Sequence, residues 1–206
     1  MELSHRAKAA AIQHSIELGP DGAAGLVNPT RYRQHNPLIG EGRASIEALH
    51  AQLPHGQAYV NVVRAFQDGD FGFVHVDYHL FEPTVAFDIH RFENGVSVEH
   101  WDGTATPRSQ QERPHLDRRQ NPGAGPDKTE SNKALARRFT QEVLVENQFA
   151  NLYEYFAGEE LMQHNPHMGD GVAELLAVQA EWERQGTPPA TTPFTGCWGR
   201  GTLFWC

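Results

Sequence analysis

The chain has 206 residues, enough for one large or two small domains, and 26 acidic against 17 basic side chains give a formal net charge of −9 at pH 7. With no block of Lys or Arg, nucleic acid and anionic membranes are poor partners, and no apolar run is long enough to span a bilayer. Residues 1–196 contain no cysteine, which excludes thiol catalysis, cysteine zinc sites and a disulfide framework there. The N-terminus is polar rather than signal-like, so we expect a cytoplasmic protein.

The first half predicts two helices followed by an antiparallel sheet. Apolar side chains recur near helical spacing in Ser4–Leu18 and in Ala44–Leu53. The Asn94-Gly95 dipeptide between two apolar runs is a strong hairpin signal. Helices that precede such a sheet indicate an α+β fold. The predicted strands are Tyr59–Phe66, Phe71–Phe81, Val85–Phe92 and Val96–Trp101.

A nine-residue phrase between the two helices occurs again later in the chain. Gln34–Gly42 and Gln163–Gly171 share Gln-His-Asn-Pro-x-x-Gly-x-Gly, at a separation of 129 residues. Helix-like stretches flank the second copy too, over Glu130–Val145 and Val172–Arg184. The separation is about one small domain, so we infer a tandem duplication of a first domain, 1–103, joined by a linker at 104–127 that is rich in Pro, Gln, Arg and Gly.

The second half does not reach the sheet that the repeat requires. The composition changes after Gly186, and both cysteines and two of the four tryptophans fall in the tail 190–206. If the gene is read in a shifted frame from the codon of Thr192 onward, it can encode a strand and turn similar to Val62–Val74 of the first half. We hypothesise that the tail is out of frame; a natural divergent tail is the alternative. Residues 128–189 would then hold only the helical part of a truncated second repeat, which we expect to be weakly folded and catalytically empty.

The motifs together resemble one protein family. The repeated phrase, the Gly69-Asp70-Phe71 turn, and Phe87–Gly95 running to Glu99-His100-Trp101-Asp102 are similar to the SnoaL-like polyketide cyclases of the nuclear transport factor 2-like superfamily. The resemblance covers residues 4–103 and again 128–186. It implies a cone-shaped α+β fold whose curved antiparallel sheet wraps around helices and leaves a deep pocket. It also implies cofactor-free intramolecular aldol condensation, although relatives include isomerases, dehydratases and plain binding domains.

Strand alternation groups the histidines and aspartates of the first half. Val96, Val98, His100 and Asp102 share one side of a strand, so apolar positions lead into a His and an Asp. In one cavity, the histidines would titrate near neutral pH and would lie beside the carboxylates of the aspartates. The candidate catalytic residues are Asp102, His100 and His35, and the pocket candidates are His75, Asp88, Tyr59 and Phe73.

Aldol cyclisation needs a base that removes a proton alpha to a carbonyl and an acid that protonates the acceptor oxygen. A His/Asp pair in a dry pocket can do both, so no cofactor and no metal is predicted. We favour Asp102 as the acid/base, with His100 or His35 orienting it or sharing its proton. The expected partner is a small hydrophobic molecule, and the sheet or the second-half helices offer a surface for a homodimer.

Structural roles compete with these assignments. The repeated phrase could only fix a loop through side-chain-to-backbone hydrogen bonds. Asp102 could simply end a strand, and Asp88 could be a buried carboxylate paired with Arg64 or Arg91. We expect His90 and His79 to be exposed rather than functional, and Trp101 to pack on the face opposite His100. For the whole protein, the alternative to an enzyme is a binding or dimerisation module of the same fold.

Overall fold

The computed structural model describes residues 2–19, 21, 25–53, 58–105, 126–163, 168–186, 198–200 and 203–205. The chain divides into two compact units, Met1–Arg108 and Ser109–Cys206, and the division falls inside segment 104–127. Each unit has its own cluster of buried apolar side chains.

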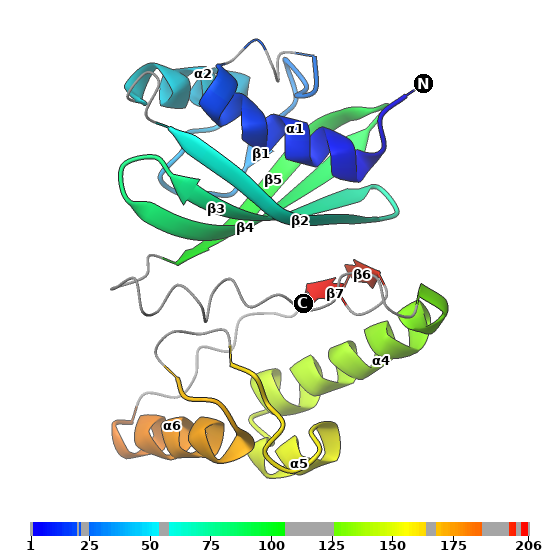
Figure 1. Ribbon diagram of the computed structural model, residues 1–206, viewed down its shortest axis with the longest axis vertical. Coiled ribbons are helices and arrows are strands. Elements are labelled where there is room, and N and C mark those ends of the chain that lie inside the picture. Colours follow the sequence, from blue (N-terminus) through cyan, green and yellow to red (C-terminus); the bar gives the residue numbers. More distant parts are fainter. Residues whose placement is uncertain are drawn as a thin grey trace. The chain divides into compact units, whose positions relative to one another are not determined.

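The first unit is a curved five-stranded sheet with helices on one face (Figure 1). Four strands form an antiparallel meander, and the short β1 lies parallel to β5 at the sheet edge, in the order β1-β5-β4-β3-β2. This arrangement confirms the predicted α+β fold. The helices are α1 (His5–Leu18) and α2 (Arg43–Gln52), and the strands are β1 (Arg33–Gln34), β2 (Tyr59–Asp68), β3 (Phe71–His79), β4 (Pro83–Glu93) and β5 (Val96–Ala105).

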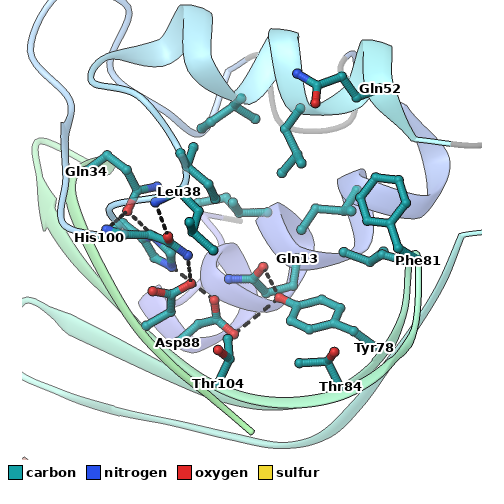
Figure 2. Close-up of a pocket in the computed structure, with 18 of the residues that line it drawn as sticks. Gln13, Gln34, Leu38, Gln52, Tyr78, Phe81, Thr84, Asp88, His100 and Thr104 are labelled. Carbon is teal, nitrogen blue, oxygen red and sulfur yellow. Dashed lines mark hydrogen bonds and ion pairs between the residues drawn. The ribbon is translucent and has the colours of Figure 1, made fainter. Parts of the chain in front are cut away.

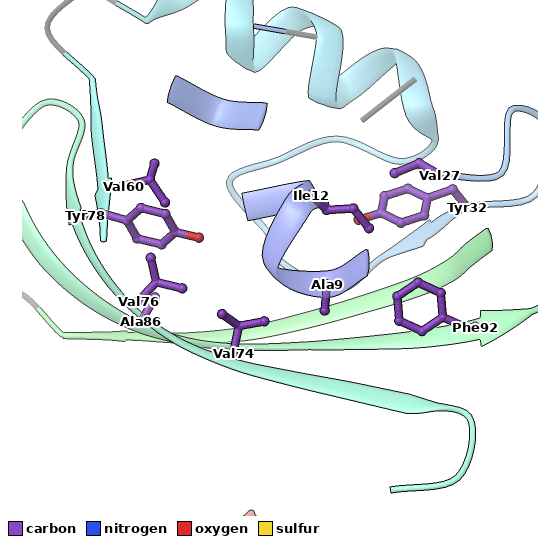
Figure 3. Packing of buried hydrophobic residues seen from close by; sticks show 10 residues of the cluster. All are labelled: Ala9, Ile12, Val27, Tyr32, Val60, Val74, Val76, Tyr78, Ala86 and Phe92. Carbon is purple, nitrogen blue, oxygen red and sulfur yellow. The ribbon is translucent and has the colours of Figure 1, made fainter. Parts of the chain in front are cut away.

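Helix α1 packs across the concave face of the sheet. Ala9 and Ile12 of α1 are buried and belong to one cluster with the inward side chains of β3, among them Val74 and Val76 (Figure 3). The close approach depends on Gly72. A Cβ atom at this position would lie 2.7 Å from the backbone oxygen of His5 and 3.0 Å from the Cβ of Ala9. The missing side chain therefore sets how deeply α1 sits on the sheet.

We expect Gly72→Ala to lower the free energy of unfolding by about 1–3 kcal/mol, because the added methyl group overpacks the contact with backbone atoms of α1. Gly25→Ala is the matched control, since a Cβ there meets nothing within 4 Å. Urea unfolding of both variants measures the effect. An unchanged midpoint for Gly72→Ala would show that α1 shifts without cost.

Two features of the sheet differ from the sequence prediction. Strand β5 continues to Ala105, so Asp102 lies inside the strand and does not end it. Strand β1 was not predicted; it pairs Arg33 with Glu99 and Gln34 with His100. The beginning of the repeated phrase is thus part of the sheet, next to the strand that carries the predicted His and Asp.

The second unit is mainly helical in its described residues. The predicted helix Glu130–Val145 is an α-helix up to Phe139 and continues as a π-helix. Val143, Phe149, Leu152 and Val172 form its buried cluster. None of the helices in the described residues is long and apolar enough to cross a membrane. Its elements are η2 (Pro126–Lys128), α4 (Thr129–Phe139), η3 (Thr140–Val145), η4 (Phe149–Asn151), α5 (Leu152–Tyr155), α6 (Val172–Arg184), β6 (Trp198–Arg200) and β7 (Leu203–Trp205).

Strands β6 and β7 form an antiparallel pair in the C-terminal tail, with Trp198 opposite Trp205. The predicted frame change falls on this tail, most of which lies outside the described residues. The natural tail and the out-of-frame tail therefore both stay open.

The two copies of the repeated phrase share local geometry at their ends. The backbone N–H of Gln34 donates to Oε2 of Glu41 at 3.1 Å, and that of Gln163 donates to Oδ1 of Asp170 at 2.8 Å. Gly42 and Gly171 then precede α2 and α6 with φ values of 78° and 99°, a region that favours glycine. Residues 164–167 lie outside the described residues. This correspondence supports the tandem duplication, which stays a prediction.

Candidate functional site

A cavity of about 370 Å³ lies between the concave face of the sheet, α1 and α2. Its two sides differ in chemistry (Figure 2). Apolar side chains line it from the helices and the loop before α2: Ile12, Ile16, Leu38, Ile39, Ile46 and Leu49. Polar side chains line it from the sheet and from α1: Gln13, Tyr78, Asp88, His90, His100 and Asp102.

The register between β4 and β5 places four titratable side chains on this wall. Asp88 lies opposite Asp102, and His90 lies opposite His100. Side chains two residues apart on a strand share a face, so both pairs point to the cavity side. Asp88, His90 and His100 are all buried. Because these side chains are buried next to one another, the atoms that carry their protons are decided by their hydrogen-bond partners.

The partners of His100 show which of its two ring nitrogens must donate a hydrogen bond. Oε1 of Gln34 accepts the backbone N–H of Asn36 at 3.0 Å and lies 2.9 Å from Nδ1 of His100. An amide oxygen only accepts hydrogen bonds, so Nδ1 carries a proton. Nε2 of His100 lies 3.0 Å from Oδ1 of Asp88. A hydrogen bond there needs one more proton, held either by the ring or by the carboxyl group.

The same reasoning makes His90 a neutral acceptor. Oε1 of Gln13 accepts the hydroxyl of Tyr78 at 2.6 Å, so Nε2 of Gln13 donates to Nε2 of His90 at 2.9 Å. Nδ1 of His90 then donates to Oγ of Ser97 at 3.1 Å. Burial, followed by the charge of His100, lowers the pKa of His90 well below its usual value. The expectation that His90 is exposed is wrong: only 1% of it is accessible.

Burial also biases the carboxyl group of Asp88. Loss of solvent raises its pKa, and the charge of Asp102 raises it further, while the hydrogen bond and charge of His100 and the hydroxyl of Tyr78 oppose this shift. The Tyr78 hydroxyl lies 3.2 Å from Oδ2 of Asp88. Arg91, one of the two partners considered for Asp88, instead pairs with Glu99 at 2.8 Å. Asp88 is therefore a proton-sharing partner of His100.

We expect His90 to make stability pH-dependent. Its pKa is below 6.5 in the folded protein, so unfolding takes up a proton once the pH falls below 6.5. Stability from His90 is complete above this pH and is lost as the pH falls toward the folded pKa, with a limiting slope of about 1.4 kcal/mol per pH unit. Urea unfolding at several pH values measures the slope. His90→Gln should flatten it, whereas the exposed His79→Gln should not; equal slopes would contradict the assignment.

Three of the seven predicted site residues line this cavity: Asp102, His100 and Asp88. The structure places His35 on the other face of β5. Its ring stacks on Trp101 with centroids 4.8 Å apart, and its Nε2 lies 2.9 Å from Oε1 of Glu99. Trp101 thus packs on the face opposite His100, as expected from strand alternation.

The other three candidates also lie away from the cavity. His75 stacks on Phe87 with ring centroids 4.4 Å apart. Phe73 stacks on Phe66 at 4.5 Å. Both belong to the face of β3 opposite the inward Val74 and Val76, and Tyr59 at the start of β2 is 51% exposed. The histidines and aspartates among the candidates therefore do not share one cavity. They divide between two faces of the sheet: Asp88, His100 and Asp102 on one, His35 and His75 on the other.

Sequence reasoning missed four polar residues of the site. Gln34 and Asn36 were visible in the repeated phrase beside His35, yet only the histidine was selected. Gln13 interrupts the apolar stripe of α1, and Tyr78 follows Val74 and Val76 on the inward face of β3. A polar side chain at a core position was the available signal. Within the described residues, no group of three His, Cys, Asp or Glu side chains is arranged to hold a metal ion.

Comparison with known proteins gives matches only among solved structures. No family model and no curated protein matches the chain. A nuclear transport factor 2-like protein of unknown function from Cytophaga hutchinsonii is 13% identical, with a TM-score of 0.44 over 51% of this chain and 93% of its own. A candidate ketosteroid isomerase from Kribbella flavida is 21% identical, with a TM-score of 0.44 over 51% and 80%.

IdmH from Streptomyces antibioticus, a candidate polyketide cyclase, is 15% identical, with a TM-score of 0.40 over 50% of this chain and 92% of its own. These alignments span about half of the chain, at low identity. Over that half, the chain is similar to these three solved structures, one of which is described as nuclear transport factor 2-like.

Proposed function

We propose that the first unit is an enzyme that performs cofactor-free acid/base chemistry on a hydrophobic carbonyl compound, by aldol condensation, cyclisation or isomerisation. One observation supports this most directly. The His100–Asp88 pair, which shares one proton, and the carboxylate of Asp102 lie on the polar wall of a cavity whose opposite side is apolar. A proton donor and a proton acceptor beside one bound molecule are what this chemistry needs.

Asp102 is the proposed base. Its Oδ2 accepts Nδ2–H of Asn36 at 2.6 Å, which orients the carboxylate at the cavity wall. The proton alpha to the substrate carbonyl passes to Asp102, and the electron pair of the C–H bond forms the enolate. The enolate carbon then attacks a second carbonyl carbon, or the proton returns at another carbon in an isomerisation.

The His100–Asp88 pair is the proposed acid. In the aldol reaction the acceptor oxygen takes the shared proton, and the proton on Asp102 later restores the pair. In an isomerisation the enol oxygen returns the shared proton when Asp102 delivers its proton to carbon, so no proton is gained or lost in either case. Burial that raises the pKa of Asp88 helps the pair to hold a proton until it is needed. The apolar side of the cavity favours a hydrophobic ligand body, and its volume is near the lower end for small-molecule sites.

The test is proton exchange at carbon in D₂O. 2-Tetralone, a hydrophobic cyclic ketone with acidic alpha protons, is incubated with the protein, and the loss of alpha-proton signals is followed by NMR. We expect saturable exchange that is faster than in buffer alone. Tetralin, which has the same ring system without the carbonyl, should compete. Binding of 2-tetralone without faster exchange would overturn the catalytic proposal.

A non-catalytic module that binds a small molecule is the second candidate. The observation that favours it is that the polar groups of the cavity satisfy one another: His100 pairs with Asp88, and the Tyr78 hydroxyl, which donates to Gln13, also lies 3.2 Å from Oδ2 of Asp88. Such pairing is also a way to keep buried polar groups stable. Binding of 2-tetralone with no exchange would support this function.

A further inference from the structure

Asn36 connects the polar wall of the cavity to its opening. Its Nδ2 donates to Oδ2 of Asp102 at 2.6 Å, and its Oδ1 accepts the backbone N–H of Leu38 at 2.8 Å. Its backbone oxygen accepts the N–H of Ile39 at 3.2 Å. One side chain thus bridges strand β5 and the residues 36–41, which we call the mouth loop.

The orientation of the Asn36 amide follows from its partners. A backbone N–H can only donate, so the atom that faces Leu38 is the amide oxygen. The amide nitrogen must then face Asp102, and Oδ2 of Asp102 must act as an acceptor. A proton placed on that oxygen, or a ligand that binds it, competes with Asn36 for its lone pairs and weakens this hydrogen bond. An amide is the side chain that can serve both neighbours at once.

Leu38 lies at the opening of the cavity. It lines the cavity, yet 93% of it is exposed. Ile39, the next residue, lines the cavity as well. An exposed apolar side chain at the edge of an apolar cavity loses contact with water when it covers a hydrophobic ligand. Movement of the mouth loop is therefore favoured once such a ligand is bound.

We propose that Asn36 is a positioning residue that couples the state of Asp102 to the mouth loop, so that engagement of this carboxylate changes the opening of the cavity. The coupling is reciprocal: a ligand that holds the loop closed also changes how Asp102 is held. The inference rests on the proposed function for its meaning, since Asp102 is the proposed base. Its test uses no substrate, so the two proposals can fail separately.

The test is hydrogen exchange at the Leu38 amide, followed by NMR. If Asn36 links the two sites, Asp102→Ala should speed exchange at Leu38 by about tenfold to a hundredfold, the effect of losing a hydrogen bond to a charged group. Asp102→Asn keeps an acceptor oxygen and should stay within about threefold of wild type. Amides of β3 serve as the reporter of global unfolding. Asp102→Ser, too short to reach Asn36, replaces the alanine variant if that does not fold.

Asp70→Ala is the matched control, because it removes a carboxylate from the exposed β2–β3 turn. It should leave exchange at Leu38 unchanged. In an Asn36→Ala background, Asp102→Ala should add no further effect, since the link is already absent. The proposal is overturned if Asp102→Ala and Asp102→Ser leave Leu38 exchange as in wild type, or if their effects simply add to that of Asn36→Ala. Asn36 would then only shape its own loop.

Discussion

Replacing Asp102 with asparagine is expected to lower the turnover number by about 100-fold to 10,000-fold and to leave ligand affinity within a few-fold of wild type. Asparagine has nearly the same shape, and its amide oxygen can still accept Nδ2–H of Asn36. It cannot take up a proton from carbon. The rate of alpha-proton exchange in 2-tetralone measures turnover, and calorimetric titration with the same ketone measures affinity.

Asp70→Asn is the control for this substitution, because it makes the same chemical change in the exposed β2–β3 turn. It should behave as wild type in both measurements. Full exchange activity in Asp102→Asn would remove Asp102 from the role of base. Loss of affinity and activity together would instead show that Asp102 contributes to binding before any proton moves.

Replacing Asp88 with alanine is expected to lower the free energy of unfolding by about 3–5 kcal/mol, because it leaves Nε2 of the buried His100 without its partner and removes one of the two partners of the Tyr78 hydroxyl. Glu93→Ala breaks ion pairs with Arg91 and Arg31 at the surface, where the Glu93 side chain is 38% exposed. That loss should be about 0–1 kcal/mol. Chemical denaturation of the two variants measures the difference. Equal losses would show that the buried pair adds no more than a surface pair.

Asp88→Asn should be milder than Asp88→Ala, since its Nδ2–H can donate to Nε2 of a neutral His100. The pH dependence of stability distinguishes a protonated from an ionised carboxyl group of Asp88. A folded pKa raised above 3.8 contributes stability below that pH, and the contribution is lost as the pH rises through the folded pKa. The asparagine variant does not titrate at this position. Its stability relative to wild type should therefore improve as the pH rises; a constant difference would contradict a raised pKa for Asp88.

Local sequence signals predicted much of the first unit. Asn94 and Gly95 adopt φ values of 50° and 79°, which the hairpin signal of Asn-Gly requires. Strand alternation predicted that His100 and Asp102 share one face of their strand. The hairpin signal predicted that the strand of Asp88 is its neighbour. These features depend on residues that are close together in the chain, so the spacing of those residues is enough to predict them.

The contacts of the repeated phrase depend on pairing between distant segments. Strand β1 has only two residues, and its parallel register with β5 leaves no periodic pattern in the sequence. Because extended residues alternate, Gln34 and Asn36 reach His100 and Asp102, while His35 turns to the opposite face. The prediction selected the residue with the more reactive side chain and missed its neighbours. The homodimer and the cytoplasmic location stay predictions.

The arrangement of β4 and β5 has a stereochemical consequence. Asp88, His100 and Asp102 all stand on these two strands and face the cavity from one side. A ketone bound between this wall and the apolar helices presents one prochiral face to the groups that exchange protons. We therefore expect proton removal and proton delivery on the same face of the ring, so that one of the two enantiotopic hydrogens of an alpha carbon is replaced by deuterium ahead of the other.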